Sequence, residues 1–322
     1  MTKQLKLSEI IPDHLFGKRL DQVLAEMFPD YSRSRIKEWI LADAVAVNGQ
    51  VQNKPREKVL GGEQVDINAE LPEDERFEAE AIDLNIVYED EHIMVINKPA
   101  GLVVHPGAGN ADGTLLNALL HHCPGIGEVP RAGIVHRLDK ETSGLMVVAR
   151  TDLAQTALVR QLQERTVGRR YLAWVWGTPA AQGKIQAMVA RDQRDRLKMA
   201  VHSIQGKPAI TLYRRLANGH FAKAPVSLLE CRLETGRTHQ IRVHLQKIGH
   251  PILGDDKYGL EAGDKELRVK HLFLHAHLAV FSHPKTSEKI RIETNLPKRF
   301  HDFLAQWDSR FLAKNLKPKE ID

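Results

Sequence analysis

The sequence contains two cysteines among 322 residues, Cys123 and Cys231. Their separation matches no metal-ligand or redox motif, so they are expected to be ordinary buried thiols in a reducing compartment. No apolar run approaches the roughly 20 residues that a membrane span requires, and the first residues show no signal-peptide pattern. These absences predict a cytoplasmic location without membrane association. The sequence also lacks internal repeats and low-complexity tracts.

Charge is unevenly distributed along the chain. The net charge is zero over residues 1–68, −9 over residues 69–91 and +14 over residues 92–322. A body this positive favours a polyanionic partner, with nucleic acid first, although a merely soluble basic protein is the alternative. The length allows one large domain and a small one, and a hydrophobic content of 42% allows a normal core.

The N-terminal part has the pattern of a small mixed domain. Residues 1–16 carry little signal and are expected to form an arm. Apolar residues at helical spacing predict one helix over 20–28 and a second from about Ser32. The Asn48-Gly49 pair predicts a hairpin over 45–51, and a further strand is expected from Gln64.

This arrangement resembles the small RNA-binding module of the ribosomal protein S4 type over residues 17–68. In that module the second helix and the hairpin face RNA. The resemblance implies RNA contacts from Arg33, Ser34, Arg35 and Lys37. A solvated basic helix face is the alternative. The acidic segment 69–83 is expected to be an interdomain linker.

One stretch organises the rest of the chain, IVHRLDKETSGLMVVAR at 134–150. Two apolar runs enclose a polar turn, which predicts strand, loop and strand. The loop places Asp139 between Arg137 and Lys140, and nearby positive charge lowers a carboxyl pKa. An ionised Asp139 could act as a nucleophile or base. The alternative is an ordinary surface turn.

Three motifs together give a more specific indication. They are YEDEHIMVINKPAGLVVHPG at 88–107, HRLDKETSG at 136–144 and ETGRTHQIRVHLQKIGHPILGDDKYG at 234–259. The sequence resembles the pseudouridine synthases, in the branch that modifies ribosomal RNA. The resemblance implies that Asp139 is the catalytic carboxylate, that Tyr171 lies in the active site, and that Arg242 pairs with Asp139.

The family's RNA contacts are expected from a further set of polar residues. They are Lys98, His105, Arg137 and Arg237. From the residues alone, Lys98 and His105 lie in a Gly- and Pro-punctuated loop where they could meet a phosphate or only solvent.

The resemblance also implies an α+β fold. We expect a mixed, largely antiparallel central sheet of the pseudouridine synthase type, with the small N-terminal α/β RNA-binding module before it. The catalytic domain is expected over 84–300 and a loose C-terminal tail over 301–322.

The implied reaction is isomerisation of uridine to pseudouridine in large-subunit ribosomal RNA or its precursor particle. It oxidises and hydrolyses nothing, so we expect no cofactor and no metal, and a monomer without an obligate protein partner. Asp139 would attack C1′ or stabilise a developing positive sugar, and Tyr171 would stack on the uracil or act as a base. Two other classes remain open, a non-catalytic RNA-binding or assembly factor and a metal nuclease using some of the 16 histidines.

Overall fold

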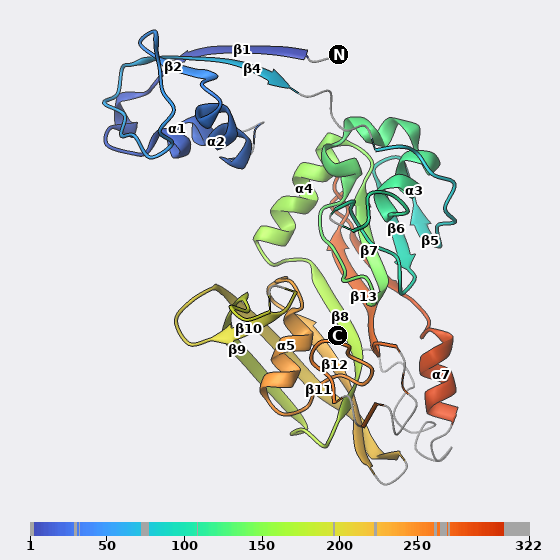
Figure 1. The fold of residues 1–322 in the computed structure, drawn as a ribbon. Helices are drawn as coiled ribbons and strands as arrows, with labels where there is room; N and C mark the ends of the chain where they lie inside the picture. Colours follow the sequence, from blue (N-terminus) through green and yellow to red (C-terminus); the bar gives the residue numbers. More distant parts are fainter. Residues whose placement is uncertain are drawn as a thin grey trace. The chain divides into compact units, whose positions relative to one another are not determined.

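The structure is a computed structural model (Figure 1). It describes residues 3–28, 31, 33–71, 77–107, 109–195, 197–221, 224–260, 263–264, 269 and 271–305. The chain divides into two compact units, Met1–Arg76 and Phe77–Asp322. None of the helices in the described ranges combines the length and the apolar character needed to cross a membrane.

The first unit packs two helices on a small antiparallel sheet. Its strands follow the order β1-β4-β2-β3. The elements are β1 (Lys3–Ile10), η1 (Asp13–Leu15), α1 (Leu20–Met27), α2 (Arg33–Leu41), β2 (Val45–Val47), β3 (Gln50–Val51) and β4 (Gln64–Leu71). The predicted helices and the Asn-Gly hairpin are confirmed: β2 pairs with β3, and Asn48 and Gly49 both adopt positive φ at the turn.

The structure differs from the expected arm at residues 1–16. Strand β1 pairs with β4 along its whole length, and Ile11 and Leu15 are buried in the core of this unit. The same pairing extends β4 to Leu71, three residues into the expected linker. Leu5 and Leu7 pack against the core of this unit, whereas Ser8, Glu9 and Ile10 are exposed, so the apolar alternation covers too few residues to predict the whole strand.

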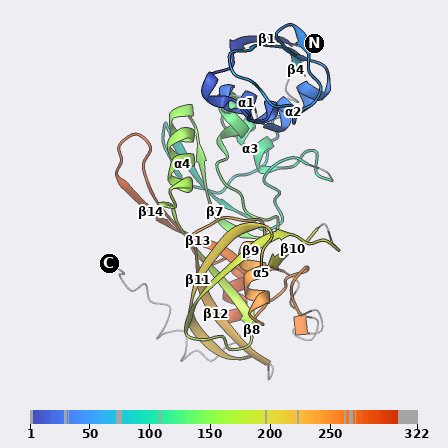
Figure 2. The same ribbon diagram turned by 90° about the vertical axis from the view of Figure 1, so that its left-hand side faces the viewer.

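The second unit is built on a large sheet with the strand order β10-β9-β11-β12-β8-β13-β7-β6-β5, and β14 pairs with β13 (Figure 2). Its strands are β5 (Ile86–Glu89), β6 (Ile93–Lys98), β7 (Ser143–Ala149), β8 (Gly168–Trp176), β9 (Gln182–Arg191), β10 (Met199–His202), β11 (Lys207–Phe221), β12 (Ala224–Leu233), β13 (Leu274–Ser282) and β14 (Lys289–Glu293). Its helices are α3 (Leu115–His122), η2 (Pro124–Glu128), η3 (Pro130–Gly133), α4 (Asp152–Gln163), α5 (Gln240–Lys247) and α7 (Lys298–Ala305).

The predicted sheet type is confirmed. Among the described strands, β13 and β7 run parallel and the other paired strands run antiparallel, so the sheet is mixed and largely antiparallel. Helices cover both faces of β6 and β7. Met94 and Ile96 pack toward α3, whereas Ile93 and Val95 pack toward α4, because successive strand side chains point to opposite faces. Helix α5 packs on β9, β10 and β11.

The domain edges differ from the expected boundaries at 84 and 300. Residues 78–80 belong to the second unit, since the Asn117 side chain donates to the Glu78 carbonyl and Glu80 N–H donates to the Asn117 carbonyl. At the other end, Phe300 and Phe303 of α7 are buried in the main core. The expected tail therefore begins inside a core helix, and residues 306–322 lie outside the described ranges.

Two glycines bracket the loop that contains Asp139. At Gly133 a Cβ atom would lie 1.7 Å from the Ala149 carbonyl oxygen, and at Gly144 it would lie 2.2 Å from the Ala276 carbonyl oxygen. Both glycines have positive φ. The expected strand at Ile134–Val135 is reduced to a single bridge between Ile134 and Val148, because the η3 turn ends immediately before it.

Candidate active site

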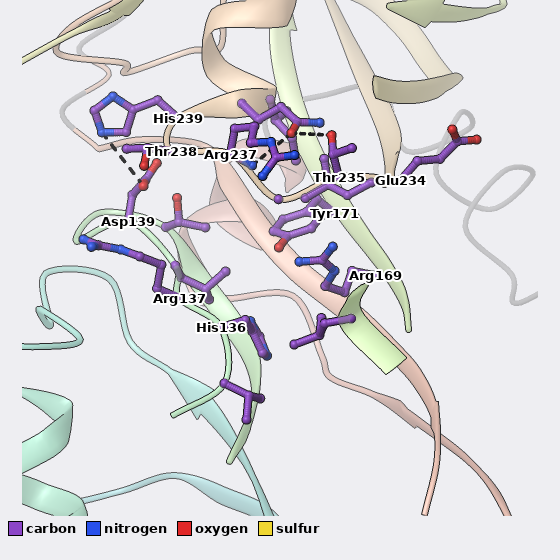
Figure 3. Close-up of a pocket in the computed structure, with 18 of the residues that line it drawn as sticks. His136, Arg137, Asp139, Arg169, Tyr171, Glu234, Thr235, Arg237, Thr238 and His239 are labelled. Atoms are coloured by element: carbon purple, nitrogen blue, oxygen red, sulfur yellow. Dashed lines mark hydrogen bonds and ion pairs between the residues drawn. The ribbon is translucent and has the colours of Figure 1, made fainter. Parts of the chain in front are cut away.

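A cleft of about 590 Å³ opens beside the Asp139 loop (Figure 3). Two segments far apart in sequence form much of its lining, residues 134–142 and residues 233–242. The charged residues that line it are Arg131, Arg137, Arg165, Arg169, Arg237, Arg242, Asp139 and Glu234. Six arginines against two carboxylates give a strongly positive cleft, which suits a polyanion.

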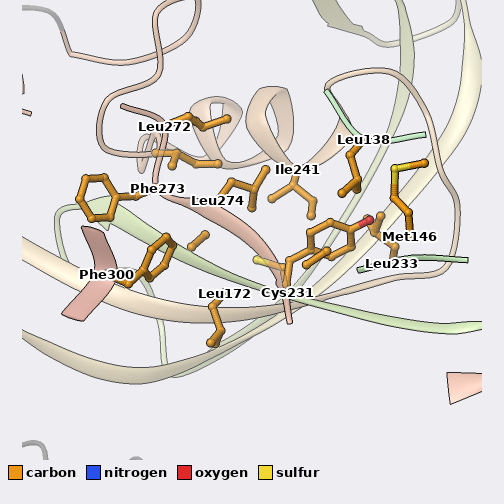
Figure 4. Close-up of a cluster of buried hydrophobic side chains, with 14 of the residues drawn as sticks. Leu138, Met146, Leu172, Cys231, Leu233, Ile241, Leu272, Phe273, Leu274 and Phe300 are labelled. Atoms are coloured by element: carbon orange, nitrogen blue, oxygen red, sulfur yellow. The ribbon is translucent and has the colours of Figure 1, made fainter. Parts of the chain in front are cut away.

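The two lining segments, 134–142 and 233–242, form the walls of the cleft. Each wall has an apolar side chain, next to a charged residue, that packs in the main hydrophobic core. Leu138 precedes Asp139 and is 4% exposed, and Ile241 precedes Arg242 and is also 4% exposed. Both belong to the hydrophobic cluster that includes Leu233 (Figure 4). In addition, Thr142 N–H donates to the Asp139 carbonyl and closes the loop into a tight turn. The carboxylate therefore stands on a rigid support.

The Arg242 guanidinium makes its shortest contacts with two carboxylates that were not predicted to be its partners, Asp255 and Asp256. Its Nε and Nη2 donate to the two carboxylate oxygens of Asp255, each at 2.7 Å, and Nη2 also donates to Asp256 at 2.9 Å. Its Nη1 lies 3.5 Å from Asp139 Oδ2, so the expected contact is present but is the longest of the set. Burial opposes the charge of Arg242, but the hydrogen bonds that it donates to Asp255 and the charges of the nearby carboxylates outweigh burial and raise its pKa.

Two further residues near Asp139 were not predicted, His239 and Tyr258. His239 Nε2 lies 3.9 Å from Asp139 Oδ1, and its Nδ1 lies 2.8 Å from the Tyr258 hydroxyl. Arg242 also lies over the Tyr258 ring, 5.2 Å from its centroid. The third motif contains all these residues, and its adjacent Asp255-Asp256 pair was the available signal that buried charge would gather around Arg242.

Gln240 fixes the turn that presents His239 and Arg242. Its amide oxygen accepts hydrogen bonds from the Thr235 hydroxyl and the Arg237 N–H, and its amide nitrogen donates to the Ile210 carbonyl. The residue is 3% exposed. The turn between β12 and α5 is held by hydrogen bonds of this buried side chain. Such side-chain hydrogen bonds produce no periodic sequence pattern, so the role of Gln240 was not predicted.

Tyr171, which the resemblance places in the active site, lines the cleft. It belongs to β8 opposite Cys231 of β12, and it is 5% exposed. Burial raises the pKa of its hydroxyl, so the phenol stays protonated at neutral pH. In Figure 3 the Tyr171 ring and the Arg169 side chain lie next to each other, farther along the cleft from Asp139. A planar ring in this position can contact a base.

Lys98 differs from the predicted RNA contact because its side chain is fully buried. Its ammonium donates to the carbonyls of Pro99, Leu102 and Lys140 at 2.8–3.0 Å. Burial lowers its pKa to about 7, although Glu141 and Asp139 act in the opposite direction. Lys98 therefore ties the loop after β6 to the Asp139 loop and is out of reach of a phosphate.

The other three polar residues of the expected RNA contact set line the cleft. Arg137 is exposed, whereas His105 and Arg237 are half-buried. Burial first, and then Arg131 and Arg137, lower the pKa of His105 to about 4. His105 is thus neutral at physiological pH, and the positive charge facing a ligand here comes from the arginines.

In the first unit, the basic residues of α2 lie on its exposed side. Arg33 pairs with the buried Asp21 at 3.0 Å and remains half-exposed. Arg35 pairs with Glu38 at 3.6 Å, and Lys37 is exposed. The side chain of Ser34 lies outside the described part of the structure. Since Arg33 also neutralises a buried carboxylate, it supports the fold of this unit as well as its surface charge.

Comparison with known proteins identifies the class. A model of the RNA pseudouridylate synthase family matches residues 92–247, and a model of the S4 domain matches residues 18–65. The matched ranges contain Asp139, Tyr171 and Arg242 in one unit and the basic helix in the other. The chain belongs to the RNA pseudouridylate synthase family and is an RNA pseudouridine synthase, an isomerase. The resemblance drawn from the three motifs is confirmed.

Particular relatives share most of the chain. It is 59% identical over 259 residues to the ribosomal large subunit pseudouridine synthase D of Escherichia coli, covering 80% of this chain and 78% of the relative. It is 52% identical over 311 residues to the protein of that name from Haemophilus influenzae, covering 94% of each. Among solved structures, human RNA Pseudouridylate Synthase Domain Containing 1 matches with a TM-score of 0.56 at 30% identity, over 68% of this chain and 86% of that one. The pseudouridine synthase type of the sheet is thereby confirmed.

Among the described residues, no three His, Cys, Asp or Glu side chains gather in an arrangement that could hold a metal ion. The adjacent His121 and His122 at the end of α3 illustrate the reason. Both side chains are exposed, and only His122 pairs with Glu89, at 3.2 Å, because neighbouring positions on a helix point in different directions.

Proposed function

We propose that this protein converts specific uridines of large-subunit ribosomal RNA to pseudouridine, with Asp139 as the catalytic carboxylate. The relatives named for this activity support the substrate class. The observation that supports the residue is its position: Asp139 is a carboxylate in an arginine-lined cleft, held on a rigid turn between Arg242 and His239. RNA phosphates supply the charge that the arginines require, and the carboxylate faces the space that a uridine would occupy.

The reaction breaks the N1–C1′ bond and forms a C5–C1′ bond. One proton leaves C5 and one is gained at N1, so the process is balanced without an oxidant, a reductant or water. Asp139 acts on the sugar, as a nucleophile at C1′ or as a stabiliser of positive charge that develops there. Arg242 contacts the carboxylate at 3.5 Å and orients it. Tyr171, a protonated phenol beside the cleft, stacks on the uracil and exchanges protons with it.

The first unit supplies a handle for RNA. Its match to an S4 domain and the exposed Arg33, Arg35 and Lys37 of α2 support this role. The net charge of residues 1–68 is zero, so the basic helix is a local patch and not a generally positive surface. A local patch favours positioning on a defined RNA site over diffuse attraction.

The direct test uses large-subunit ribosomal RNA that carries tritium at C5 of uridine. Formation of the C5–C1′ bond releases that tritium into water, so release measures the reaction itself. We expect release by the wild-type protein and none by Asp139→Asn, whose amide keeps the shape but loses the charge. RNA binding by this variant should be nearly unchanged. A variant that retained a tenth of the single-turnover rate would exclude Asp139 from this role, because loss of a nucleophile costs far more.

A further inference from the structure

His239 lies beside Asp139 in an unusual backbone conformation. It precedes α5 with φ of 53° and ψ of 21°, in the left-handed region that side chains other than glycine rarely adopt. The buried Gln240 holds the turn in place. Strain of this kind persists where the surrounding structure fixes it, and here it directs an imidazole at the Asp139 carboxylate.

The hydrogen bonds of Tyr258 determine which ring nitrogen of His239 carries the proton. The Tyr258 hydroxyl oxygen accepts from Met199 N–H at 2.7 Å. A backbone N–H can only donate, so the hydroxyl hydrogen needs a different acceptor. His239 Nδ1, at 2.8 Å, is the ring nitrogen in place to accept it. With Nδ1 accepting, the proton of a neutral imidazole resides on Nε2, which is the atom facing Asp139.

The surroundings favour the neutral form of this ring. Burial lowers the pKa of His239 and outweighs the opposing effects of Asp139 and Asp255. Arg242 and Lys257 act in the same direction as burial. A protonated His239 would also place a hydrogen on Nδ1, opposite the Tyr258 hydroxyl hydrogen, and would break that hydrogen bond.

We propose that His239 is a positioning residue for the reaction, a neutral N–H donor to Asp139 whose tautomer is fixed by Tyr258. This inference rests on the proposed role of Asp139. The carboxylate is then held from two sides by different chemistry, by the charged Arg242 at Oδ2 and by the uncharged Nε2–H of His239 at Oδ1. The separation of 3.9 Å closes to a hydrogen bond as the carboxylate takes up its position against the bound uridine.

A neutral donor orients the carboxylate without adding a second full positive charge. A second cation at this distance would stabilise the carboxylate further and reduce its reactivity toward the sugar. In many functional sites, a hydrogen bond at one ring nitrogen of a histidine fixes the orientation of the ring and the role of the other nitrogen. Tyr258 supplies that orienting contact here, and it acts through His239 without reaching Asp139.

The first test does not depend on catalysis. Nitrogen-15 NMR of labelled wild-type protein distinguishes the Nδ1–H and Nε2–H forms of a neutral histidine, and a His239→Asn spectrum identifies the signal. We expect the Nε2–H form in the wild type and a mixture in Tyr258→Phe, which lacks the hydroxyl. An Nδ1–H form or a charged ring in the wild type at neutral pH overturns the proposal, whatever the RNA substrate proves to be.

The second test is a double-mutant cycle in the tritium-release assay. His239→Asn keeps a residue that tolerates left-handed backbone, but its shorter side chain cannot place an N–H where the imidazole Nε2–H lies. We expect it to lower the single-turnover rate roughly ten- to a hundredfold with little change in KM, because a hydrogen bond to a charged group is lost. Tyr258→Phe should lower the rate less, and adding it to His239→Asn should lower the rate no further.

If His239→Asn and Tyr258→Phe lower the single-turnover rate independently, the role of Tyr258 is overturned. If His239→Asn has a normal rate, the role of His239 is overturned. Unfolding midpoints in urea separate these outcomes from simple loss of structure, because Tyr258→Phe also leaves Met199 N–H without its acceptor. If the wild type itself releases no tritium while the NMR result holds, the proposed function fails and the hydrogen-bond assignment stands.

Discussion

Replacing Arg242 by alanine should affect stability before it affects chemistry. The guanidinium is 3% exposed, and the Asp255 side chain that it binds through two nitrogens is completely buried. Removing one member of such a pair leaves an uncompensated buried charge, which costs on the order of 3–5 kcal/mol. The whole free energy of unfolding of a typical domain is about 5–15 kcal/mol. Arg242→Ala should therefore lower the urea midpoint markedly and remain folded only under mild conditions.

The catalytic effect must then be measured on folded protein. At a temperature where circular dichroism shows the variant folded, we expect its single-turnover rate to fall at least a hundredfold, about 3 kcal/mol, because Asp139 loses its charged contact at 3.5 Å. Arg242→Lys keeps the charge but cannot bind both oxygens of Asp255, so it should recover only part of the rate. Arg160→Ala is the matched control. It breaks an exposed helix pair with Glu164 and should change stability by no more than about 0.5 kcal/mol.

Two neighbouring substitutions rank the partners of Arg242. Asp255→Asn keeps the acceptor oxygen for the backbone N–H groups of Lys257 and Tyr258 but removes the charge, and it should slow the reaction by loosening the guanidinium. Asp256 is 63% exposed, so Asp256→Asn should have little effect. If Arg242→Ala keeps half of the wild-type rate, or if Asp256→Asn is the more damaging of the two aspartate variants, the reasoning is refuted.

Three further predictions concern pH and the first unit. The pKa of Lys98 falls from 10.5 to about 7 on folding, so the unfolded chain binds the extra proton between these values and stability rises with pH there. Urea midpoints at increasing pH should therefore rise more steeply in the wild type than in Lys98→Met. Burial lowers the pKa of His136 to about 3, and its Nε2 accepts from Val147 N–H, so the fold loses stability as pH falls below about 6.5. As the pH falls, the urea midpoint of His136→Gln should decrease less than that of the wild type. The urea midpoint of the control His301→Gln, at an exposed histidine, should decrease as much as that of the wild type. Deleting residues 1–76 should weaken binding to ribosomal RNA more than it lowers the single-turnover rate at saturating enzyme, and unchanged affinity would exclude the first unit as an RNA handle.

Local pattern predicted α1, α2 and the β2–β3 hairpin because the pattern and the packing agree. Elements of the second unit carry similar signals. Thr114 precedes α3, and its side chain and that of Asn117 form a reciprocal cap, whereas α5 ends just before Gly249, which has the left-handed conformation typical of helix ends. Strand β6 is a continuous apolar run, and burial on both faces explains that run.

The contacts around Asp139 were less predictable than its identity. The sequence suggested that its neighbours Arg137 and Lys140 hold its charge, whereas the basic side chains that contact it in the described structure are Arg242 and His239. These come from a turn about one hundred residues away. Spacing in sequence predicts contacts along a helix or a strand, but it carries no information about which loops meet across a sheet.

Lys98 is a second residue whose surroundings could not be predicted from the sequence. A lysine in a Gly- and Pro-punctuated loop has the appearance of a phosphate ligand, and burial is the property that a single sequence reveals least for a charged residue. The structure buries it because three backbone carbonyls converge on one ammonium. Such convergence depends on two loops that are 42 residues apart.

The place of β13 in the large sheet has a consequence for synthesis on the ribosome. This strand, Leu274–Ser282, lies between β7 and β8 and is the element that joins them. Both walls of the cleft, residues 134–142 and 233–242, leave the ribosome before it does. Two separate ladders can form by then, but the strand that joins them into one sheet is still missing. A chain stalled before residue 274 should carry every charged residue of the cleft and no working cleft, so modification of RNA must wait until this strand has been made and inserted.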